Sequence, residues 1–284
     1  MAANARPHAA HAPVVYKTFV PPAPFDAFIE NIWYWRGFDP GHAKDTIMAS
    51  ARTGLMINLA SETLAWYDGE RYGRRNALKG PVLCGGHSAA FAIDAFQASN
   101  MGVQFKPGGA FAFFSGSARH FENAHVALGD LWGADAERLH QRLIEAPTPD
   151  AKIDMLFRAM VVRFNEAVRH PAVEIALGLF RRSPHRVSVA TAAREAEVSP
   201  KKLIRLFAEQ IGMTPKAYLR VSRFQRVLER VHPAESVDWM EEVERHGYYD
   251  QPHFIREFKE FSGFTPSEYF RLRGPYQQHV PLEA

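Results

Sequence analysis

A repeat in the C-terminal part constrains the fold of this chain more than any other feature. Shifting the sequence against itself by 51 residues aligns apolar, basic, glycine and Thr-Pro positions. The matching pairs are Leu203 with Phe254, Arg205 with Arg256, Phe207 with Phe258, Gly212 with Gly263, Thr214-Pro215 with Thr265-Pro266, Tyr218 with Tyr269 and Arg220 with Arg271. Agreement at a single offset indicates two copies of one structural unit.

Each copy predicts a short helix, a tight turn and a second helix. The predicted short helices and their turns are 188–195 with Glu197-Val198, and 236–245 with Gly247-Tyr248. Ser199 and Asp250 are suited to begin the second helices because their side chains accept backbone N–H groups. Gly212 and Gly263 are expected to end these helices, since glycine adopts the left-handed conformation found at helix C-termini.

The second helix of each copy combines an apolar stripe with a polar face. The apolar positions are Leu203, Leu206, Phe207 and Ile211 in the first copy and Phe254, Phe258 and Phe261 in the second. The polar positions are Lys201, Lys202 and Arg205 in the first copy and Gln251, Arg256 and Lys259 in the second. Such a helix fits the major groove of DNA, where Arg pairs with guanine and Gln with adenine. The pattern predicts two helix-turn-helix units, against the alternative of a helical repeat that packs only on protein.

The charge distribution indicates a surface that faces a polyanion. The formal net charge of the 284 residues is only +3. Residues 1–180 carry 17 basic and 17 acidic side chains, residues 181–230 carry 12 and 4, and residues 231–284 carry 5 and 10. A basic surplus that begins near Arg181 is typical of a nucleic-acid-binding segment. A single solvated helix face that is basic by chance is the alternative.

The second copy carries a long motif, Gly247-Tyr-Tyr-Asp-Gln-Pro-His-Phe-Ile-Arg-Glu-Phe-Lys259, continued by Gly263-Phe-Thr-Pro266. With this motif, residues 185–273 resemble the DNA-binding module of the AraC/XylS family of transcription regulators. The resemblance implies seven helices, in which a long helix at Pro215–Val231 joins two helix-turn-helix units. It also implies that both recognition helices enter successive major-groove segments on one face of the duplex.

The resemblance assigns roles to individual residues. The base-facing positions that it implies are Lys201, Lys202, Ile204 and Arg205 in the first unit and Gln251, His253, Ile255 and Arg256 in the second. The phosphate-facing positions, which lie on the flanks, are Ser199, Arg220, Arg223 and Lys259. The implied partners are double-stranded DNA, RNA polymerase and a second copy of the chain, in a regulator expected to be a cytoplasmic, nucleoid-associated activator.

Two positions depart from the family pattern. Glu197 stands where the family usually has glycine in the first turn, so a left-handed backbone there is expected to be strained. Val243 stands where the family favours a smaller residue, so the short helix of the second unit is expected to pack less closely. Because the chain is acidic after residue 231, we expect the first unit to carry most of the salt dependence of DNA binding.

The first 180 residues predict a mixed α/β unit. Helices are predicted at 24–35, 109–118, 133–145 and 150–169, and strands at 55–59, 63–67, 90–96 and 102–106, with a hairpin turn at Asp68-Gly69. The expected fold class is therefore α+β, with a β-rich N-terminal sensor domain that includes helices and an all-α DNA-binding module with two helix-turn-helix units. The predicted boundaries are a disordered tail at 1–14, an effector or interaction domain at 15–147, a helical connector at 148–182, the DNA-binding domain at 183–275 and a tail at 276–284.

Candidate sites in the first half are few. Trp33, Trp35, Trp66 and Tyr67 are candidates for an effector pocket, with core packing as the alternative. Cys84 and His87 flank two glycines and are open to interpretation as a nucleophile and its base, although a buried structural thiol is the commoner arrangement. The sequence lacks the histidine pattern of metal-binding barrels, so we expect no catalytic residue, metal or cofactor.

These observations predict a sequence-specific DNA-binding regulator whose N-terminal domain senses a small-molecule effector or a partner. A single cysteine fits a reducing compartment, and no apolar stretch is long enough to span a membrane. The first alternative is an enzyme-like N-terminal domain fused to a DNA reader that controls its own gene. The second is an architectural DNA binder without an effector.

Overall fold

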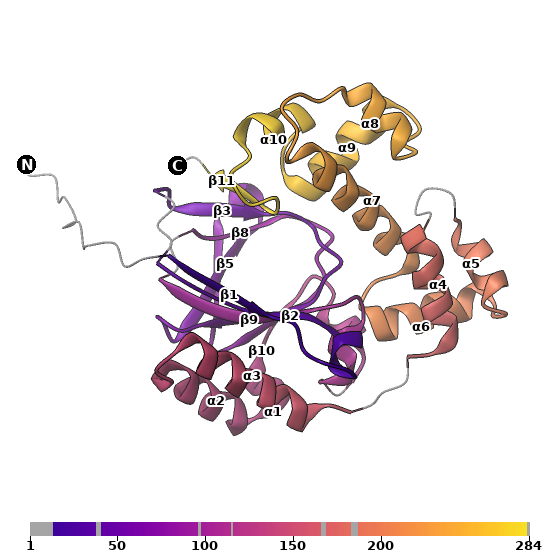
Figure 1. Cartoon of the computed structure of the whole chain (residues 1–284). Coiled ribbons are helices and arrows are strands. Elements are labelled where there is room, and N and C mark those ends of the chain that lie inside the picture. The colour runs from indigo at the N-terminus through magenta and orange to yellow at the C-terminus, as the bar shows by residue number, and fades with distance from the viewer. Residues whose placement is uncertain are drawn as a thin grey trace, which may run out of the picture.

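The computed structural model describes residues 14–37, 41–95, 98–114, 116–165, 169–182 and 187–282. A β-rich N-terminal region with two sheets precedes a helical C-terminal region (Figure 1). The expected α+β class, with a β-rich first domain and a helical module of two helix-turn-helix units, is confirmed. Apart from Val14, the predicted N-terminal tail lies outside the described residues. No helix in the described part of the chain is long and apolar enough to cross a membrane.

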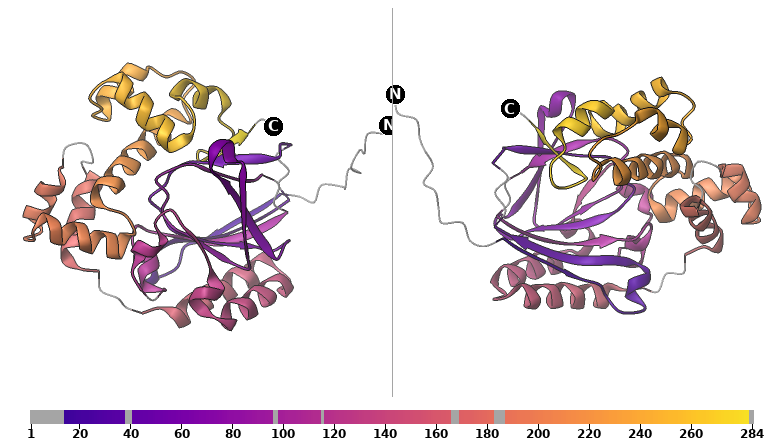
Figure 2. Two further views of the ribbon diagram at one scale, coloured as in Figure 1. Left: turned by 180° about the vertical axis from the view of Figure 1, so that it is seen from behind. Right: turned by 45° about the horizontal axis from the view of Figure 1, so that its top comes forward.

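Two antiparallel sheets face each other in the N-terminal region (Figure 2). In spatial order, the first sheet contains β1 (Val15–Phe19), β2 (Ile29–Arg36), β9 (Ser99–Phe105), β4 (Gly54–Asn58), β7 (Val82–Cys84) and β10 (His125–Ala127). The second contains β11 (His279–Leu282), β3 (Lys44–Ile47), β8 (Phe91–Asp94), β5 (Thr63–Asp68) and β6 (Arg74–Lys79). The four predicted strands correspond to β4, β5, β8 and β9, although Phe96 lies outside the described residues. The predicted hairpin joins β5 to β6 and uses Gly69 at φ +76°.

The first sheet buries one face under three helices, α1 (Leu128–Trp132), α2 (Ala134–Glu145) and α3 (Pro149–Arg163) (Figure 1). Side chains that alternate along the strands, such as Ile32, Leu55 and Val103, pack with Leu143 and Leu156 of the helices in one apolar core. Each fully buried side chain of this size contributes about 1.5–3 kcal/mol. The opposite face of this sheet is turned toward the second sheet, so α1 to α3 leave the space between the sheets uncovered.

Two helix predictions in the first half were wrong. Within 24–35 only Phe25–Ala27 forms a 3-10 turn, η1, and β2 follows at once. A bulge between Ile29 and Asn31 places Ile29 and Ile32 on the same buried face, so a strand imitates the three-residue spacing of a helix. Within 109–118 two separate 3-10 turns form, η3 (Gly109–Ala112) and η4 (Ala118–Phe121), and Gly116 between them has a φ of +100° that no regular helix accommodates.

Seven helices begin at or after Pro171 in the described part of the chain, the number that the resemblance implies, but the first of them lies in the predicted connector at 148–182 and only six lie in the predicted module at 183–275. They are α4 (Pro171–Arg182), α5 (Val189–Glu195), α6 (Pro200–Ile211), α7 (Pro215–Val231), α8 (Trp239–Arg245), α9 (Gln251–Ser262) and α10 (Pro266–Leu272). α7 spans both halves of the module: its Tyr218 lies in a core with α4, α5 and α6, whereas its Phe224 lies in a core with α8, α9 and α10. α3 packs on the first sheet and α4 on α5 and α6, so the two helices of the predicted connector belong to different cores.

The C-terminal region is held against the N-terminal region at several points. Residues expected to form a C-terminal tail include β11, which pairs with β3 and extends the second sheet. The backbone N–H of Ala49 donates to the carbonyl of Phe261 at the end of α9 (2.9 Å), and the Gln225 amide of α7 donates to the carbonyl of Ala49. α6 contacts η3 and η4 through its C-terminal end. The helical module is therefore fixed to the sheets at both of its halves.

Candidate nucleic-acid interface

Equivalent residues fix α6 and α9 at both ends. The Ser199 hydroxyl accepts the backbone N–H of Lys202 (3.2 Å), and the Asp250 carboxylate accepts that of His253 (2.7 Å). Gly212 and Gly263 end the helices in the left-handed conformation, with φ of +87° and +82°. Each cap stabilises its helix by about 1 kcal/mol. The two helices therefore begin and end at repeat-equivalent positions, as the sequence predicted.

The N-terminal halves of both helices are exposed on the side away from their cores. Of the predicted base-facing residues, those exposed to solvent are Lys201, Lys202, Ile204, Arg205, Gln251, Ile255 and Arg256. Ile204 is 42% exposed and the equivalent Ile255 is 36% exposed. His253 is only partly exposed, because its ring packs edge-on against Tyr248 and its Nε2 lies 3.9 Å from Glu257. The exposed faces combine cations, an amide and one isoleucine per helix.

The turns of the two units differ. Glu197 has φ +52° and Gly247 has φ +67°, so the left-handed residue expected in the first turn is present without a glycine. Both turns close with the same hydrogen bond, from Val198 to Ala193 and from Tyr248 to Val243, each 3.0 Å. The second turn then has one extra residue, Tyr249, which is 92% exposed. The expectation of looser packing at Val243 stays a prediction; its side chain is 4% exposed within the second core.

Arg220 and Arg223, two of the predicted phosphate contacts, lie in an ion-pair cluster between α7 and α9. Glu257 is 2% exposed and accepts from Arg220 Nε and Arg223 Nη2, both at 2.8 Å. Arg220 also donates to Glu260 (2.7 Å), and the Arg223 guanidinium lies 4.2 Å from the centroid of the Tyr248 ring. These contacts hold α9 against α7. Among the phosphate candidates, Lys259 remains exposed on α9, and the Ser199 hydroxyl caps α6.

The surfaces of the two units differ in charge. The first unit (residues 188–212) contains four Lys or Arg and three Asp or Glu, whereas the second unit (residues 238–263) contains three and seven. Within the first unit, Arg205 pairs with Glu209 at 3.2 Å, and both side chains are largely exposed. Pairs of this kind are weak and readily exchange partners with a phosphate or a base. The more electropositive of the two recognition surfaces is therefore that of α6.

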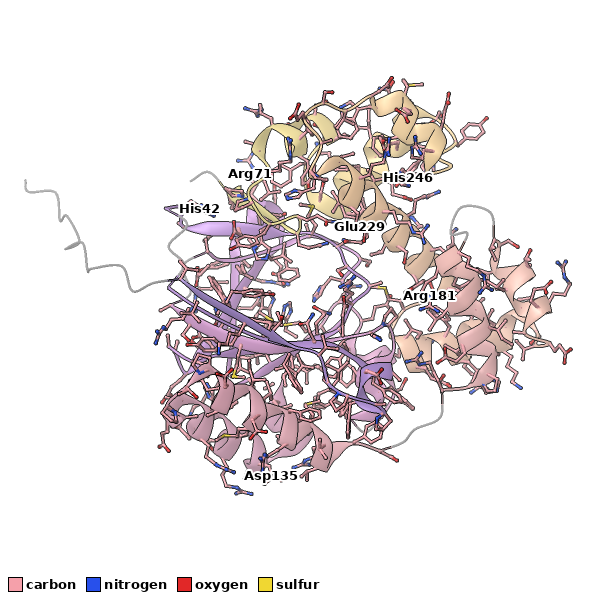
Figure 3. All side chains as sticks on the ribbon, in the orientation of Figure 1. His42, Arg71, Asp135, Arg181, Glu229 and His246 are labelled. Atoms are coloured by element: carbon pink, nitrogen blue, oxygen red, sulfur yellow. The ribbon has the colours of Figure 1, made fainter. Side chains whose placement is uncertain are left out.

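Three of the four aromatic residues predicted to line an effector pocket face the space between the two sheets. Trp33 and Trp35 alternate with the buried Ile32 and Tyr34 on β2, so they point toward the second sheet. Trp66 stacks on His125 of the opposite sheet, with ring centroids 4.3 Å apart. Tyr67 points the other way: its hydroxyl donates to Asp94 (2.8 Å) and Lys44 lies over its ring. In Figure 3, side chains from both sheets project into the space between them.

The environment of Cys84 and His87 does not fit a nucleophile and its base, since the Cys84 thiol contacts the Val82 carbonyl and His87 Nε2 has no hydrogen-bond partner within the described structure. Burial raises the pKa of the Cys84 thiol to about 12, which is the opposite of the change that activates a thiolate. Burial also lowers the pKa of His87 to about 4. Within the described residues, no three His, Cys, Asp or Glu side chains are grouped so that they could hold a metal ion.

His125 and Phe91 were missed by sequence reasoning. They meet Trp66 and His87 only because β10 pairs with β7 and β8 pairs with β5. His125 lies opposite Cys84 in that register. A single sequence carries no local signal for a pairing between residues so far apart, so neither position stood out.

Two known protein families match the chain, one in the helical C-terminal region and one in the β-rich N-terminal region. A family described as a helix-turn-helix domain matches residues 192–272, and a domain of unknown function (DUF6597) matches residues 17–127. No curated protein sequence matches the chain.

Several solved structures are similar to parts or most of the chain. The C-terminal domain of AraT, a response regulator from Geobacillus stearothermophilus, is 26% identical, with a TM-score of 0.35 over 39% of this chain and 93% of that one. A DNA-binding transcriptional dual regulator from Escherichia coli K-12 is 22% identical, with a TM-score of 0.32 over 38% and 96%. ToxT from Vibrio cholerae O395 is 13% identical, with a TM-score of 0.44 over 90% and 97%.

The assignment rests on agreement between sequence and geometry. The motif from Gly247 to Pro266 forms a capped recognition helix, its repeat forms a second one, and a helix-turn-helix family spans both. The helical module at residues 192–272 is a helix-turn-helix domain of the AraC/XylS type, which is found in DNA-binding transcription regulators.

Proposed function

We propose that the chain reads double-stranded DNA in a sequence-specific manner, with α6 and α9 in successive segments of the major groove. The observation that carries the proposal is the paired exposure of Ile204 and Ile255, 42% and 36%, one residue before Arg205 and Arg256. Burial of an isoleucine side chain is energetically favourable, yet at both positions this side chain is exposed to solvent next to an arginine. Apolar contact with a thymine methyl and bidentate pairing of arginine with guanine use such a surface.

The proposed roles of the remaining residues depend on their positions on the helices. Lys201 and Lys202 lie in the first turn of α6, and Gln251 lies in the first turn of α9, so they are proposed to contact base edges or the adjacent backbone. Lys259 is proposed as a phosphate contact because it is exposed on α9. The N-terminus of α6 at Ser199 offers backbone N–H groups to a phosphate. Arg220 and Arg223 are proposed to position α9 through Glu257 instead of binding phosphate.

The N-terminal region is proposed to sense an effector and to pass its effect to both recognition helices. A Cβ placed on Gly212, at the end of α6, would lie 2.9 Å from the Ala118 carbonyl of η4. A Cβ placed on Gly263, at the end of α9, would lie 2.8 Å from the Tyr72 hydroxyl in the β5–β6 connection. Because each recognition helix ends on the N-terminal region, a change there alters the relative placement of the two helices. An effector that prefers one placement shifts the population toward it.

The proposal is tested by selecting bound fragments from genomic DNA with the purified full chain at about 150 mM salt, a concentration at which nonspecific phosphate contacts are already weakened. The wild type is compared with Arg205→Ala and Arg256→Ala. We expect a bipartite motif with elements about one helical turn apart, and each variant should relax one element. Binding without any motif would contradict sequence-specific reading and would favour the architectural alternative.

A further inference from the structure

A cluster of five side chains connects the two sheets where they converge. The inter-sheet cluster contains Trp66 and Phe91 from the second sheet, Cys84 and His125 from the first, and His87. His87 lies 4.7 Å from both Phe91 and His125, measured between ring centroids, and Phe91 lies edge-on to His125 at 4.9 Å. Ser50 and His87 form an isolated antiparallel bridge that holds the His87 backbone.

The cluster is apolar in spite of its three ionisable groups. Burial lowers the pKa of His87 to about 4 and, together with the neighbouring His87, lowers that of His125 to about 3. Burial raises the pKa of Cys84 to about 12, so all three groups are uncharged at neutral pH. His87 Nε2 is buried and has no hydrogen-bond partner within the described structure. A buried polar atom left in this state costs about 1–3 kcal/mol, which a hydrogen-bonding ligand group would recover.

The inner faces of the sheets offer little to an anion. Along the described strands, residues alternate between the two faces, and Arg74 is the one Lys or Arg that projects between the sheets. It lies at the exposed end of the β5–β6 hairpin, where it pairs with Asp68 through two hydrogen bonds. A carboxylate or phosphate bound deep between the sheets would therefore lose its hydration without gaining a counter-charge.

Several apolar side chains of these inner faces are only partly buried, although Leu64 and Val82 on the same faces are buried. Met56, Trp66, Phe91 and Ile93 are each partly exposed, and none belongs to any of the three buried apolar cores of the described structure. By contrast, the strand residues on the other face of the first sheet, such as Leu55 and Ile57, are fully buried. A small ligand can bind where partly exposed aromatic and aliphatic side chains lie next to an unpaired buried nitrogen, here His87 Nε2.

We propose that the inter-sheet cluster binds a neutral aromatic molecule that carries a hydroxyl or amide group, whose ring packs against the exposed surface of Trp66 and Phe91 and whose polar group hydrogen bonds to His87 Nε2. This inference rests on the proposed effector-sensing function and names the chemical class of the effector. A neutral imidazole nitrogen donates or accepts according to its tautomer, and hydroxyl and amide groups satisfy either role. The stacked rings select a planar ligand over a flexible aliphatic one.

The position of His87 also explains how such a ligand reaches the DNA reader. Its neighbour Gly86 contacts Met213, which follows α6 directly; a Cβ on Gly86 would lie 2.9 Å from Met213 Cε. Its bridge partner Ser50 is preceded in the chain by Ala49, which is hydrogen bonded to Phe261 of α9 and to Gln225 of α7. The residue that contacts the ligand therefore lies between the attachment points of the first and the second unit.

The test measures binding of matched probes to the full chain by titration calorimetry. The neutral probes are phenol, 2-naphthol and 2-naphthamide, and the anionic probes of the same ring size are benzoate and 2-naphthoate. We expect at least one neutral probe to bind about tenfold more tightly than its matched anion. If no neutral probe binds more tightly than its anion, the proposed ligand class is wrong.

Variants locate the site. His87→Phe keeps the ring and removes the nitrogen, and should weaken the preferred neutral probe about tenfold, in line with the loss of one buried hydrogen bond. Trp66→Leu should weaken it by a similar factor, whereas Tyr67→Phe, the adjacent residue on the opposite face, should leave it unchanged. A thermal melt of each variant shows whether it remains folded; a folded His87→Phe protein with wild-type affinity would overturn the assignment of the polar contact.

Two further readouts separate this proposal from the proposed function. Affinity for the neutral probe should stay constant from about pH 8 to about pH 5, because His87 and His125 stay unprotonated there, whereas an ordinary histidine near 6.5 would titrate. A steep loss of affinity between these values would contradict the neutral-imidazole contact. The DNA selection is scored on the same protein: an intact bipartite motif without probe binding refutes the ligand class alone, and probe binding without a motif refutes the DNA reader alone.

Discussion

The two helix-turn-helix units are copies of one sequence pattern, but different chemistry holds their recognition helices in place. In the first unit Leu206 of α6 packs into an apolar core with Phe180 and Tyr218. In the second unit the position 51 residues later is Glu257, buried and bonded to two arginines of α7. Both helices bury an apolar stripe, but this one position is closed by hydrophobic burial in the first unit and by an ion-pair cluster in the second.

Because of this difference, the roles of the arginines of α7 do not follow from their charge alone. Glu257 pairs with both Arg223 and Arg220, and Glu260 pairs with Arg220, so the two positive charges are balanced by two carboxylates inside the second unit. Cations that remain available to DNA are then concentrated on α6, in the unit that also has fewer acidic residues. The long helix α7 thus supports the second reader structurally, and we expect the first reader to supply more of the attraction to phosphate.

Removing the charge of Glu257 should produce the largest effect. Glu257→Gln should lower the free energy of unfolding by about 2–4 kcal/mol, because it leaves Arg223 without a counter-charge and Arg220 with only the exposed Glu260. Glu260→Gln is the control, since Glu260 is exposed and pairs with Arg220 only; its effect should stay below about 1 kcal/mol. Chemical denaturation of the full chain measures both. Equal effects of the two substitutions would show that the cluster is not what holds the second unit.

The contrast in electrostatics predicts different DNA-binding defects for the equivalent arginines. Arg205→Ala and Arg256→Ala should each weaken specific binding by about 1–3 kcal/mol, as loss of a bidentate base contact does. The salt dependence of binding should fall more for Arg205→Ala, because the first unit carries the free positive charge. Fluorescence anisotropy at several salt concentrations measures both quantities, with Arg158→Ala on α3 as an exposed control. Equal changes in salt slope would remove the electrostatic distinction between the units.

The exposed isoleucines test whether the two units read bases in the same way. Ile204→Ala and Ile255→Ala should each weaken binding to a selected site by about 1 kcal/mol, a cost of the size of one mismatched base pair. Because both side chains are exposed, unfolding free energies should change by less than about 0.5 kcal/mol. Leu203→Ala, one residue away but fully buried, should instead cost about 2–5 kcal/mol of stability. A stability loss from Ile204→Ala would indicate packing in place of base reading.

Substitutions in the two turns should have the smallest effects, and their effects on the free energy of unfolding should have opposite signs in the two units. Glu197→Gly should raise the free energy of unfolding by about 0.5–1 kcal/mol, because the left-handed backbone at φ +52° is strained for glutamate and relaxed for glycine. Gly247→Ala should lower it by about 1 kcal/mol for the same reason. Glu197→Gln, which removes the charge and keeps the strain, is the matched control and should have no effect. Stabilisation by Glu197→Gln would assign the effect to charge.

Local features of the reader were predictable from the sequence because they lie within one or two helical turns. The caps at Ser199 and Asp250, the glycines that end the helices and the left-handed Glu197 all follow from contacts between near neighbours. In the N-terminal region the same approach failed for 24–35, because the spacing of Ile29 and Ile32 reflects a bulge that only the pairing of β2 with β9 defines. Periodicity alone does not distinguish these two causes.

The class of the protein, the two recognition helices and their exposed faces were predictable from the sequence alone, since repeat spacing, capping and amphipathic pattern are local properties. By contrast, the pairing of β11 with the second sheet, the ion pairs of Glu257 with the arginines of α7 and the stacking of His125 on Trp66 emerge only in the folded structure. These contacts join residues distant in the chain. Their partners depend on strand register and on how helices cross, which no local pattern encodes.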